Sequence, residues 1–466
     1  MEKRTKIIAT IGPATFDKKI VEEMYNCGLD AIRINTSHGD FEQYKKAISV
    51  IRKVGDIPII LDTQGRGTRL RGESIVVEKG KTVKVGFSKK FTHFFDFDFH
   101  SKIKPGQKML VGDGFLEFKV LRKSKDYLIL FALGSGTVVD GKSVSFPGID
   151  LGMPLLTNKD KKVLSFAKKN KIEFIALSFT QTKKDIQIVK KLLGNSETNI
   201  IAKIEDPKGV ENAVDLIEHS DALMIARGDL GVELPSEKVP IIQKQLIKEC
   251  NIKAKPAIVA TQMLLSMVEN SRPTRAETSD VANAILDGAD CVMLSNETAV
   301  GKYPVKSVRE MQKIALNVEP LNKNHVRNKY LTKTVEDVIT KSIQNFSMHL
   351  SINKVVCITR TGFTARNISR FRISKQIIAI TPDKMTQMKL KIVYGVKPIL
   401  CEELPVESRI LNSAKFLFNK KIIKKSDLVL FTAGIYSDKE GTSNSVQIHR
   451  MNDLIKYFKL SERKVK

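Results

Sequence analysis

The feature that most constrains the fold is a recurring alternation of two kinds of segment. Short apolar runs rich in β-branched residues lie at residues 6–11, 31–35, 58–63, 174–179, 199–205, 222–229, 257–263 and 291–297. Amphipathic stretches with helical spacing, such as 17–28 and 182–194, separate most of these runs. Strands that alternate with helices form parallel sheets. Eight such units predict a closed (β/α)8 TIM barrel, which typically takes about 250 residues.

The alternation is interrupted once and later starts again. The interruption is rich in Gly, Val, Phe and Lys and carries turn signals such as "VGDGF" and "ALGSG", which predict a small all-β insertion. Beyond residue 330, further strands are expected at 354–359, 376–381 and 427–434. The sequence therefore predicts an α/β protein with a barrel domain in two parts (1–70 and 147–330), an inserted β-barrel lid domain (71–146) and a C-terminal α/β domain (331–466).

Composition restricts the classes of function. Five widely spaced cysteines without a C-x-x-C pair indicate reduced thiols in a cytoplasm rather than disulfides or a zinc cluster. We expect no membrane association, because no apolar run is long enough to cross a bilayer and the N-terminus lacks a signal-peptide core. The net charge of +27 comes from lysine pairs scattered along the chain. This pattern favours a solvated basic surface over a nucleic-acid-binding stripe.

Polar residues follow seven of the eight strands at their C-terminal ends, where the active sites of such barrels lie. They are Arg33, Asn35, Ser37, Asp62, Thr63, Ser178, Lys203, Glu205, Arg227, Asp229, Thr261, Ser295 and Glu297. At any single strand, a polar residue that caps the next helix is an equally good interpretation. Seven strands together, with charges of both signs, favour an active site.

Lys203, Glu205 and Asp229 form the group with the most specific chemical interpretation. Lys203 and Glu205 share one strand face because side chains alternate along a strand. Glu205 and Asp229 end consecutive strands, and two carboxylates without His or Cys suit a hard cation such as Mg²⁺ or Mn²⁺. Lys203 beside them suits stabilisation of a transferring phosphoryl group. The alternative is a structural salt bridge among these three residues and Arg227.

Several long motifs then carry a resemblance to the pyruvate kinase family. They include "AIRINTSHGD", "LDTQG", "AKIEDPKGV", "MIARGDLGVELP", "PAIVATQMLLSM", "RPTRAETSDVANAILDGADCVMLSNETAVGKYP" and "GTSNSVQIH". The resemblance implies a barrel, a lid and a regulatory domain. It implies transfer of the phosphoryl group of phosphoenolpyruvate to ADP, giving pyruvate and ATP in the last step of glycolysis. It also implies Mg²⁺ (or Mn²⁺), K⁺, a cytoplasmic location and a homotetramer.

The same motifs imply roles residue by residue. Lys203 would stabilise the transferring phosphoryl group, Thr261 would help the enolate take up a proton, and Arg33 would bind the phosphate. The implied substrate contacts are Arg33, Lys203, Ala226, Arg227, Gly228, Asp229 and Thr261. Glu205 and Asp229 would bind Mg²⁺, while K⁺ would lie among Asn35, Ser37, Asp62 and Thr63. The implied nucleotide contacts are Asn35, His38, Arg69 and Lys142.

Some positions depart from the family pattern. Thr36 stands where the family usually has Phe, and Gln64–Gly67 ("QGRG") replaces Lys-Gly-Pro-Glu. An acidic residue at the position of Gly67 accompanies K⁺ dependence and a lysine accompanies independence, so neither rule applies here. If Arg66 folds inward, its guanidinium reaches the substrate carboxylate or Asp62 and supplies the charge that K⁺ otherwise brings. If it points to solvent, the more common fate of a loop arginine, K⁺ still activates, and this is the outcome we expect. These departures motivate an alternative, a catalytically weak paralogue with a ligand-binding or regulatory role. A nucleic-acid-binding protein on an enzyme scaffold is motivated only by the net charge.

A last motif, "TRTGFTARNISRFR", resembles the loop that holds a sugar-phosphate effector in regulated family members. Thr359, Thr361 and Thr364, with the backbone at Gly362, would cradle a phosphate there. A strand-to-helix turn without a ligand explains the motif equally well.

Overall fold

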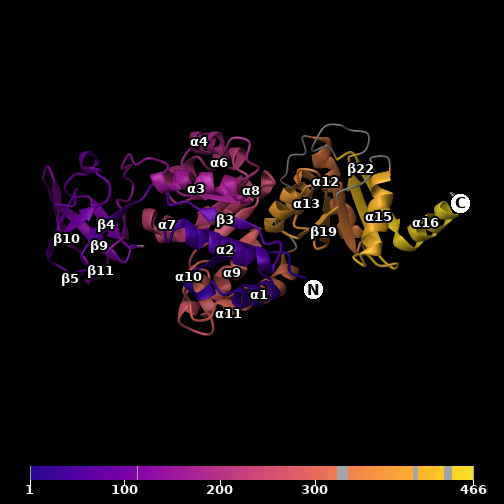
Figure 1. The fold of residues 1–466 in the computed structure, drawn as a ribbon, viewed down its shortest axis with the longest axis horizontal. Helices are drawn as coiled ribbons and strands as arrows, with labels where there is room; N and C mark the ends of the chain where they lie inside the picture. Colours follow the sequence, from indigo (N-terminus) through magenta and orange to yellow (C-terminus); the bar gives the residue numbers. More distant parts are fainter. Residues whose placement is uncertain (1, 113, 323–333, 402–407, 435–442, 465–466) are drawn as a thin grey trace.

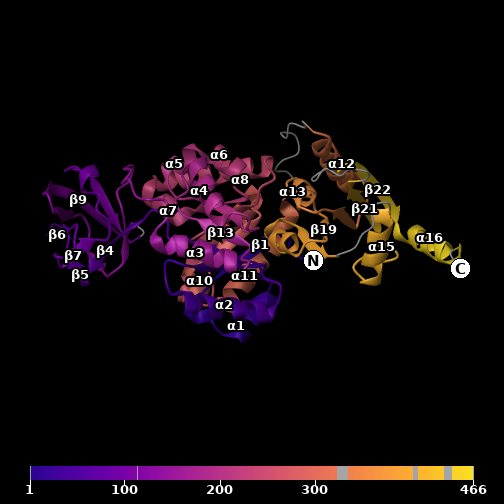
Figure 2. The ribbon, with the colours of Figure 1, turned by 45° about the horizontal axis from the view of Figure 1, so that its top comes forward.

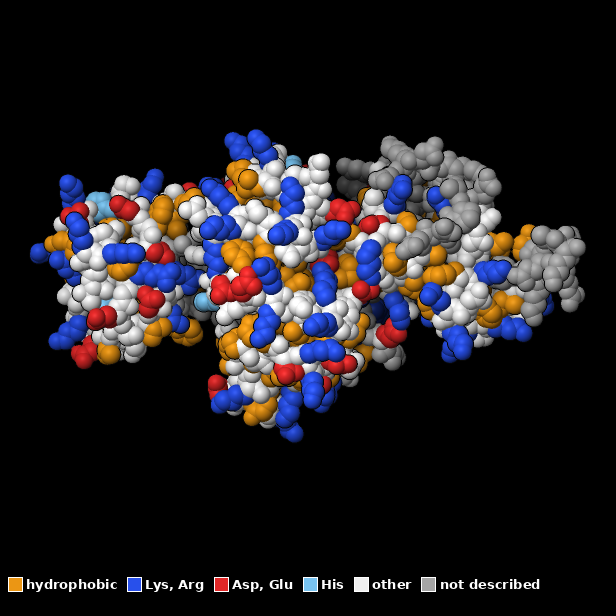
Figure 3. All heavy atoms as spheres, viewed as in Figure 1, with side chains coloured by type: hydrophobic (Ala, Val, Ile, Leu, Met, Phe, Trp, Pro, Cys, Tyr) orange, Lys and Arg blue, Asp and Glu red, His pale blue; other side chains and the backbone are white. Residues whose placement is uncertain are grey.

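Three domains lie in a row along the longest axis of the molecule (Figure 1). The computed structural model describes residues 2–112, 114–322, 334–401, 408–434 and 443–464. The large barrel lies in the centre, with the inserted β domain at one end and the C-terminal domain at the other (Figures 1 and 2). On the face drawn in Figure 3, Lys and Arg side chains are spread over all three domains rather than gathered in one stripe. Within the described ranges, no helix is both long and apolar enough to span a bilayer.

The central domain is a closed barrel of eight parallel strands, in the order β1-β17-β16-β15-β14-β13-β3-β2. The strands are β1 (Lys6–Ile11), β2 (Ala31–Asn35), β3 (Ile59–Asp62), β13 (Phe174–Leu177), β14 (Asn199–Ile204), β15 (Ala222–Ala226), β16 (Ala257–Ala260) and β17 (Cys291–Leu294). The fold predicted from the sequence is thus confirmed. Six of the strands stop earlier than the apolar runs suggested, because each run continues into the loop or short helix that follows its strand.

Alternate residues of each strand serve two apolar cores. Ile7 packs with the surrounding helices, whereas its neighbour Ile8 packs inside the barrel, and both are fully buried. The outer ring comprises α1 (Lys18–Asn26), α2 (Phe41–Val54), α3 (Asn158–Lys169), α4 (Lys183–Leu193), α6 (Ala213–His219), α8 (Val239–Ile252), α9 (Arg275–Asp287) and α11 (Pro304–Val318). Capping boxes at Asp40, Thr157 and Thr274 satisfy free amide groups at three helix starts. Shorter helices α5 (Pro207–Glu211), α7 (Arg227–Glu233) and α10 (Asn296–Ala299) follow strand ends.

The inserted domain, called the lid here, is a second closed barrel with its own apolar core. Its strands are β4 (Thr68–Gly72), β6 (Thr82–Gly86), β7 (His93–Phe95), β8 (Lys108–Val111), β9 (Leu116–Lys123), β10 (Tyr127–Ala132) and β12 (Lys142–Ser145). A separate ribbon pairs β5 (Ile75–Val77) with β11 (Gly136–Val138). The first strand of the lid begins at Thr68, ahead of the expected boundary at residue 71.

The C-terminal domain has a five-stranded sheet in the order β20-β19-β18-β21-β22. The expected strands are present as β18 (Lys354–Ile358), β19 (Gln376–Thr381) and β21 (Leu428–Ala433). Two strands were not anticipated, β20 (Val396–Leu400), which contains Lys397 and Pro398, and the antiparallel edge strand β22 (Ser445–Arg450). The described helices are α12 (Val335–His349), α13 (Phe363–Ser369), α14 (Lys384–Lys389), α15 (Arg409–Asn419) and α16 (Met451–Lys464). The motif match at 441–449 begins outside the described residues.

The C-terminal domain closes the amino end of the central barrel, called the barrel floor here. Ile392, in the short turn Leu390–Ile392, is 1% exposed and packs inside the barrel with Ile8 and Ile60. Beside it, the Cys291 thiol donates a hydrogen bond to the Ile392 carbonyl at 3.1 Å. The barrel interior is therefore sealed by another domain at one end and remains accessible at the other.

Candidate active site

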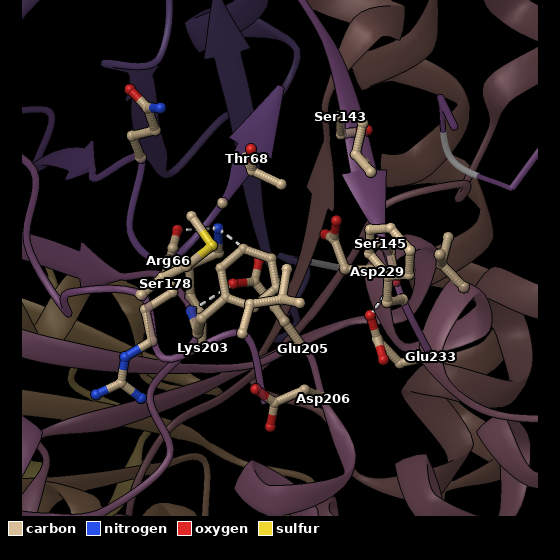
Figure 4. Close-up of a pocket in the computed structure, with 18 of the residues that line it drawn as sticks. Arg66, Thr68, Ser143, Ser145, Ser178, Lys203, Glu205, Asp206, Asp229 and Glu233 are labelled. Atoms are coloured by element: carbon tan, nitrogen blue, oxygen red, sulfur yellow. Dashed lines mark hydrogen bonds and ion pairs between the residues drawn. The ribbon is translucent and has the colours of Figure 1, made fainter. Parts of the chain in front are cut away.

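A cavity of about 400 Å³ lies where the carboxyl ends of the barrel strands face the lid (Figure 4). The barrel contributes most of the residues that the motifs singled out: Arg33, Asn35, Ser37, Asp62, Thr63, Lys203, Glu205 and Asp229. The lid contributes Arg69, Gly112, Ser143 and Ser145, among others. The sequence prediction that polar strand ends converge is thus confirmed for these positions. We call this end of the barrel, with its cavity, the mouth.

Lys203 is the centre of a buried charge network. Its ammonium group lies 3.0 Å from Asp62 Oδ1 and 2.8 Å from Glu205 Oε1, and it donates to Ser178 Oγ at 2.7 Å. The other oxygen of Asp62 accepts a hydrogen bond from Arg33 Nε at 2.6 Å. Three of these side chains are nearly inaccessible: Asp62, Lys203 and Glu205 are 1%, 7% and 2% exposed. The charges are tolerated at this depth because each is paired.

The pairing determines the protonation of the network. Burial pulls the pKa of Lys203 down, but Asp62 and Glu205 outweigh it, so the pKa is raised and the ammonium is held. Burial also disfavours the Asp62 carboxylate, yet Arg33 and Lys203 keep its pKa below the ordinary value. The pKa of Glu205 is raised, first by burial and then by repulsion from Asp229 and Asp62. At Glu205, burial and the two carboxylates therefore outweigh the opposing attraction of Lys203 on the pKa.

Glu205 and Asp229 are the residues that fit a divalent cation. Both line the cavity and carry only oxygen donors, which suit Mg²⁺ or Mn²⁺. The repulsion that raises the pKa of Glu205 is what a bound cation would relieve. Among the described residues, no cluster of three or more His, Cys, Asp or Glu side chains is arranged to hold a metal. Further ligands would have to come from substrate oxygens or water.

The four residues expected to surround a monovalent cation also lie together. Asn35, Ser37, Asp62 and Thr63 all line the cavity, although the Thr63 carbonyl already accepts a hydrogen bond from Ser178 Oγ at 2.7 Å. Thr36, which replaces the usual Phe, is fully buried. Its hydroxyl donates to the Asp62 carbonyl at 2.6 Å and so ties β2 to β3. The substitution therefore supports the backbone around Asp62.

Thr261 lies in a strained turn that Arg227 holds in place. Thr261 and Gln262 both have left-handed backbone angles, with φ of 69° and 53°. The Arg227 guanidinium donates to both of their carbonyls, at 2.9 and 3.1 Å, and pairs with Asp280 at 2.6 Å. Thr261 Oγ1 accepts a hydrogen bond from the Gly228 amide at 2.6 Å. Arg227, Gly228 and Thr261 are thus bound to one another. They and Ala226 are not among the described residues that line the cavity, whereas the next residue, Asp229, is.

Only two of the four residues predicted to contact the nucleotide line the cavity. Asn35 and Arg69 belong to the described lining of the cavity, whereas His38 and Lys142 do not. Arg69 Nη1 donates to the Gly141 carbonyl at 2.6 Å, which places it on the lid strand pair β4–β12. The pKa of His38 is lowered by burial and by the neighbouring charge of Arg69.

The lid is tied to the barrel through two carboxylates that the sequence analysis did not identify. Asp160, fully buried at the start of α3, accepts hydrogen bonds from the Gln64 and Gly65 amides at 2.8 and 3.2 Å. Glu233, in α7, accepts a hydrogen bond from Ser145 Oγ and one from the Gly148 amide at 3.4 Å. The capping pattern "TNKD" is the one local signal that could have identified Asp160, and the sequence around Glu233 carries no sign that the lid would contact it.

Arg66 lines the mouth cavity, but its ion-pair partner is Asp185 rather than Asp62. Its guanidinium pairs with Asp185 at 2.7 Å and donates to Gln181 Oε1 at 2.5 Å. Asp62, the partner that the hypothesis named, instead pairs with Arg33 and Lys203. Arg66 therefore anchors the loop that enters the lid.

Two further predicted groups have structural partners. Glu297 is buried and accepts hydrogen bonds from the Leu264 and Ser295 amides, so the capping interpretation fits this residue.

In the C-terminal domain, Thr359 Oγ1 accepts a hydrogen bond from the Gly362 amide at 3.0 Å, and Thr364 Oγ1 lies 2.6 Å from Ser443 Oγ. Thr361 lines a separate cavity that faces the barrel. The turn is formed as predicted, and its ligand remains a prediction.

Comparisons with known proteins agree with the fold and show the family. The family description "Pyruvate kinase, barrel domain" matches residues 2–308, and "Pyruvate kinase, alpha/beta domain" matches residues 337–449. The chain is similar to a pyruvate kinase of Staphylococcus epidermidis, with 38% identity over 97% of this chain and 81% of the relative. A Staphylococcus aureus pyruvate kinase is 37% identical over the same shares. The crystal structure of a pyruvate kinase from Cryptosporidium parvum superposes with a TM-score of 0.88 at 32% identity, covering 97% of this chain and 96% of that one.

Proposed function

This chain belongs to the pyruvate kinase family and is a phosphotransferase, and from that premise we propose that it transfers the phosphoryl group of phosphoenolpyruvate to ADP. The products are pyruvate and ATP. The observation that carries the proposal is the buried ammonium of Lys203, held between Asp62 and Glu205 at the edge of a cavity that Asp229 also lines.

Lys203 stabilises the phosphoryl group during transfer. The group passes through a state whose charge is spread over its peripheral oxygens, so a fixed cation beside it lowers the barrier. Lys203 is fixed by three partners and is buried, which strengthens its field relative to water. Arg33, held by Asp62 and Thr10, presents a second cation for the substrate phosphate.

Glu205 and Asp229 hold the divalent cation that the family uses, and we propose Mg²⁺ or Mn²⁺. When bound, such an ion neutralises charge on phosphoryl and carboxylate oxygens. Asn35, Ser37, Asp62 and Thr63, which line the same cavity, would hold K⁺. Arg66 is engaged with Asp185 and Gln181, which supports K⁺ dependence rather than its replacement by the guanidinium.

Thr261 acts at the carbon that gains a proton. Its hydroxyl is oriented by the Gly228 amide, and its backbone is fixed by Arg227. The lid excludes water from the phosphoryl group when it closes over the mouth, which protects the group from hydrolysis. Arg69 and Lys142, on paired lid strands, approach the nucleotide phosphates in that closed form.

The test is a coupled assay that measures pyruvate formed from phosphoenolpyruvate, with ADP, Mg²⁺ and K⁺ each omitted in turn. We expect ATP formation that needs both the nucleotide and Mg²⁺. Binding of phosphoenolpyruvate without turnover would instead indicate a weak paralogue with a regulatory role. We also propose a homotetramer, which light scattering coupled to size-exclusion chromatography checks.

A further inference from the structure

A lysine to which the sequence analysis gave no role lies at the rim of the mouth. Lys159 is the second residue of α3 and directly precedes Asp160, the residue that holds the loop entering the lid. The Lys159 ammonium donates a hydrogen bond to the Gly39 carbonyl at 2.9 Å and lies 5.6 Å from the centre of the Tyr44 ring. Lys159 therefore stands between the loop that follows β2 and the entrance to the lid.

The groups that hold this ammonium are themselves fixed. Tyr44 is 3% exposed, and its ring centre lies 5.6 Å from that of Phe41 and 6.4 Å from that of Phe166. The Tyr44 hydroxyl lies 2.5 Å from the His38 carbonyl and 3.1 Å from the Gly39 carbonyl. Aromatic packing and backbone hydrogen bonds therefore set the position of the ammonium group, which differs in this respect from a lysine that extends into solvent.

Lys159 is not neutralised by a carboxylate. It forms no ion pair within the part of the chain that the structure describes. Asp160 and Asp40 are near enough to oppose the lowering of its pKa by burial, but both carboxylates serve backbone amides. Asp160 accepts a hydrogen bond from the Gln64 amide at 2.8 Å, and Asp40 accepts one from the Gln43 amide at 2.9 Å. A cation held by a carbonyl and an aromatic ring keeps donors for an anion.

Two further basic groups come close to Lys159 from other elements. His38 lies in the loop after β2, and Arg69 lies on β4 of the lid. The pKa of His38 is lowered first by burial and then by the charges of Arg69 and Lys159. Arg69 also lowers the pKa of Lys159, after burial. Electrostatic effects between partly exposed groups are short-ranged, so the barrel loop, α3 and the lid bring these three groups to one region.

This region adjoins the cavity of the mouth. Asn35 and Ser37 line the cavity, whereas His38, the next residue of the same loop, does not. A substrate longer than the cavity, with its reacting phosphate near Lys203, therefore leaves the cavity over His38. ADP is such a substrate, because its β-phosphate accepts the phosphoryl group and its α-phosphate and ribose extend away from the reacting atoms.

We propose that Lys159 is a further nucleotide-binding residue, which contacts the α-phosphate of ADP beside Arg69. This inference rests on the proposed function and deepens it. Arg69 and Lys142 belong to the lid and move with it, whereas Lys159 belongs to the barrel. Lys159 therefore supplies a stationary cation that binds the nucleotide before the lid closes.

Isothermal titration calorimetry with ADP and Mg²⁺, on the full chain and without phosphoenolpyruvate, tests the proposal. We expect Lys159→Gln to bind ADP about tenfold more weakly than the wild type, because it removes one charge-assisted contact. Lys159→Arg, which keeps a cation, should recover at least part of the affinity. In steady-state kinetics, Lys159→Gln should raise the KM for ADP by a similar factor, with kcat and the KM for phosphoenolpyruvate within twofold of the wild type.

Lys161→Gln and Lys162→Gln are the matched controls, because both remove an exposed lysine from the same helix, and both should bind ADP like the wild type. A Lys159→Gln variant that binds ADP as tightly as these controls overturns the inference and leaves the proposed function intact. If Lys159 only braces the loop after β2, Lys159→Gln raises the K⁺ requirement and the KM for phosphoenolpyruvate as much as the KM for ADP, which also overturns it.

Failure of the proposed function has a different signature. A wild type that binds ADP through Lys159 but forms no ATP refutes the proposed function and leaves this inference standing. A wild type that does not bind ADP refutes both.

Discussion

Buried charged groups have different kinds of partner at the two ends of the central barrel. At the mouth, Lys203, Asp62 and Glu205 are bound mainly to other side chains around an accessible cavity. At the floor, Asp290 accepts hydrogen bonds from the backbone amides of Ala257 and Tyr394, at 3.0 Å each, and pairs with Arg372 at 2.7 Å. Both groups are buried and fully engaged, but only the mouth has partners that a ligand can replace.

This difference separates two uses of a buried ion pair. Side-chain partners can exchange for substrate oxygens or a cation, so the charges at the mouth are available for chemistry. Backbone amides cannot be exchanged without unfolding, so the Arg372–Asp290 pair fastens the C-terminal domain to the barrel. We therefore expect substitutions at the mouth to reduce activity and substitutions at the floor to reduce stability.

The largest effect is expected at the floor. Arg372→Met leaves Asp290 buried without its cation and should lower the free energy of unfolding by about 3–5 kcal/mol. Urea denaturation followed by circular dichroism measures the loss. Lys384→Met, which breaks an exposed pair with Asp56, is the matched control and should cost about 0–1 kcal/mol. Equal losses in the two variants would contradict a special role for the floor.

Lys203→Met should have the next largest effect, and on turnover rather than folding. A positioned group that acts on developing charge is worth about 2.7–4 kcal/mol, or about 10²–10³ in kcat. Steady-state kinetics with phosphoenolpyruvate and ADP measure this. Lys183→Met, which removes an exposed lysine paired with Asp215, should retain wild-type turnover. A Lys203→Met enzyme within threefold of wild type would remove Lys203 from the mechanism.

Glu205→Gln and Asp229→Asn test whether these two carboxylates bind Mg²⁺ at the mouth. Each variant removes one anionic ligand, so the Mg²⁺ concentration for half-maximal rate should rise about tenfold or more. Glu233→Gln is the control, because Glu233 lines the same cavity but is bonded to Ser145 of the lid. If all three variants require the same Mg²⁺ concentration as the wild type, only a structural salt bridge remains for Glu205.

The smallest effect is expected for Arg66→Ala. Arg66 pairs with Asp185, whereas Asp62 pairs with Arg33, so the loss of Arg66 should leave the activation by K⁺ unchanged. Activity is compared in K⁺ and in a tetraalkylammonium buffer free of K⁺ and Na⁺, for the wild type and the variant. A wild type that runs without K⁺, and a variant that then needs it, would restore Arg66 as the substitute for the cation.

The architecture and most of the mouth can be predicted from the order of the residues alone. All eight barrel strands were visible as apolar runs, because a strand buried on both faces needs nearly continuous hydrophobicity. The positions of Lys203, Glu205 and Asp229 followed from strand alternation and from the rule that parallel strands end at the same edge. The lid was visible as a break in the helix–strand alternation. These are local or periodic properties, which a single chain displays directly.

Which charged groups meet depends on the assembled fold. Lys203 and Asp62 come together across 141 residues because β3 and β14 both flank β13 in the closed barrel. No local pattern showed that Arg66 would form an ion pair with Asp185 or that Arg372 would pair with Asp290. Nor did one show that Glu233 would accept a hydrogen bond from the lid. Each partner is chosen by geometry between distant elements, since the strength of a buried ion pair depends on distances and burial that only the assembled fold sets.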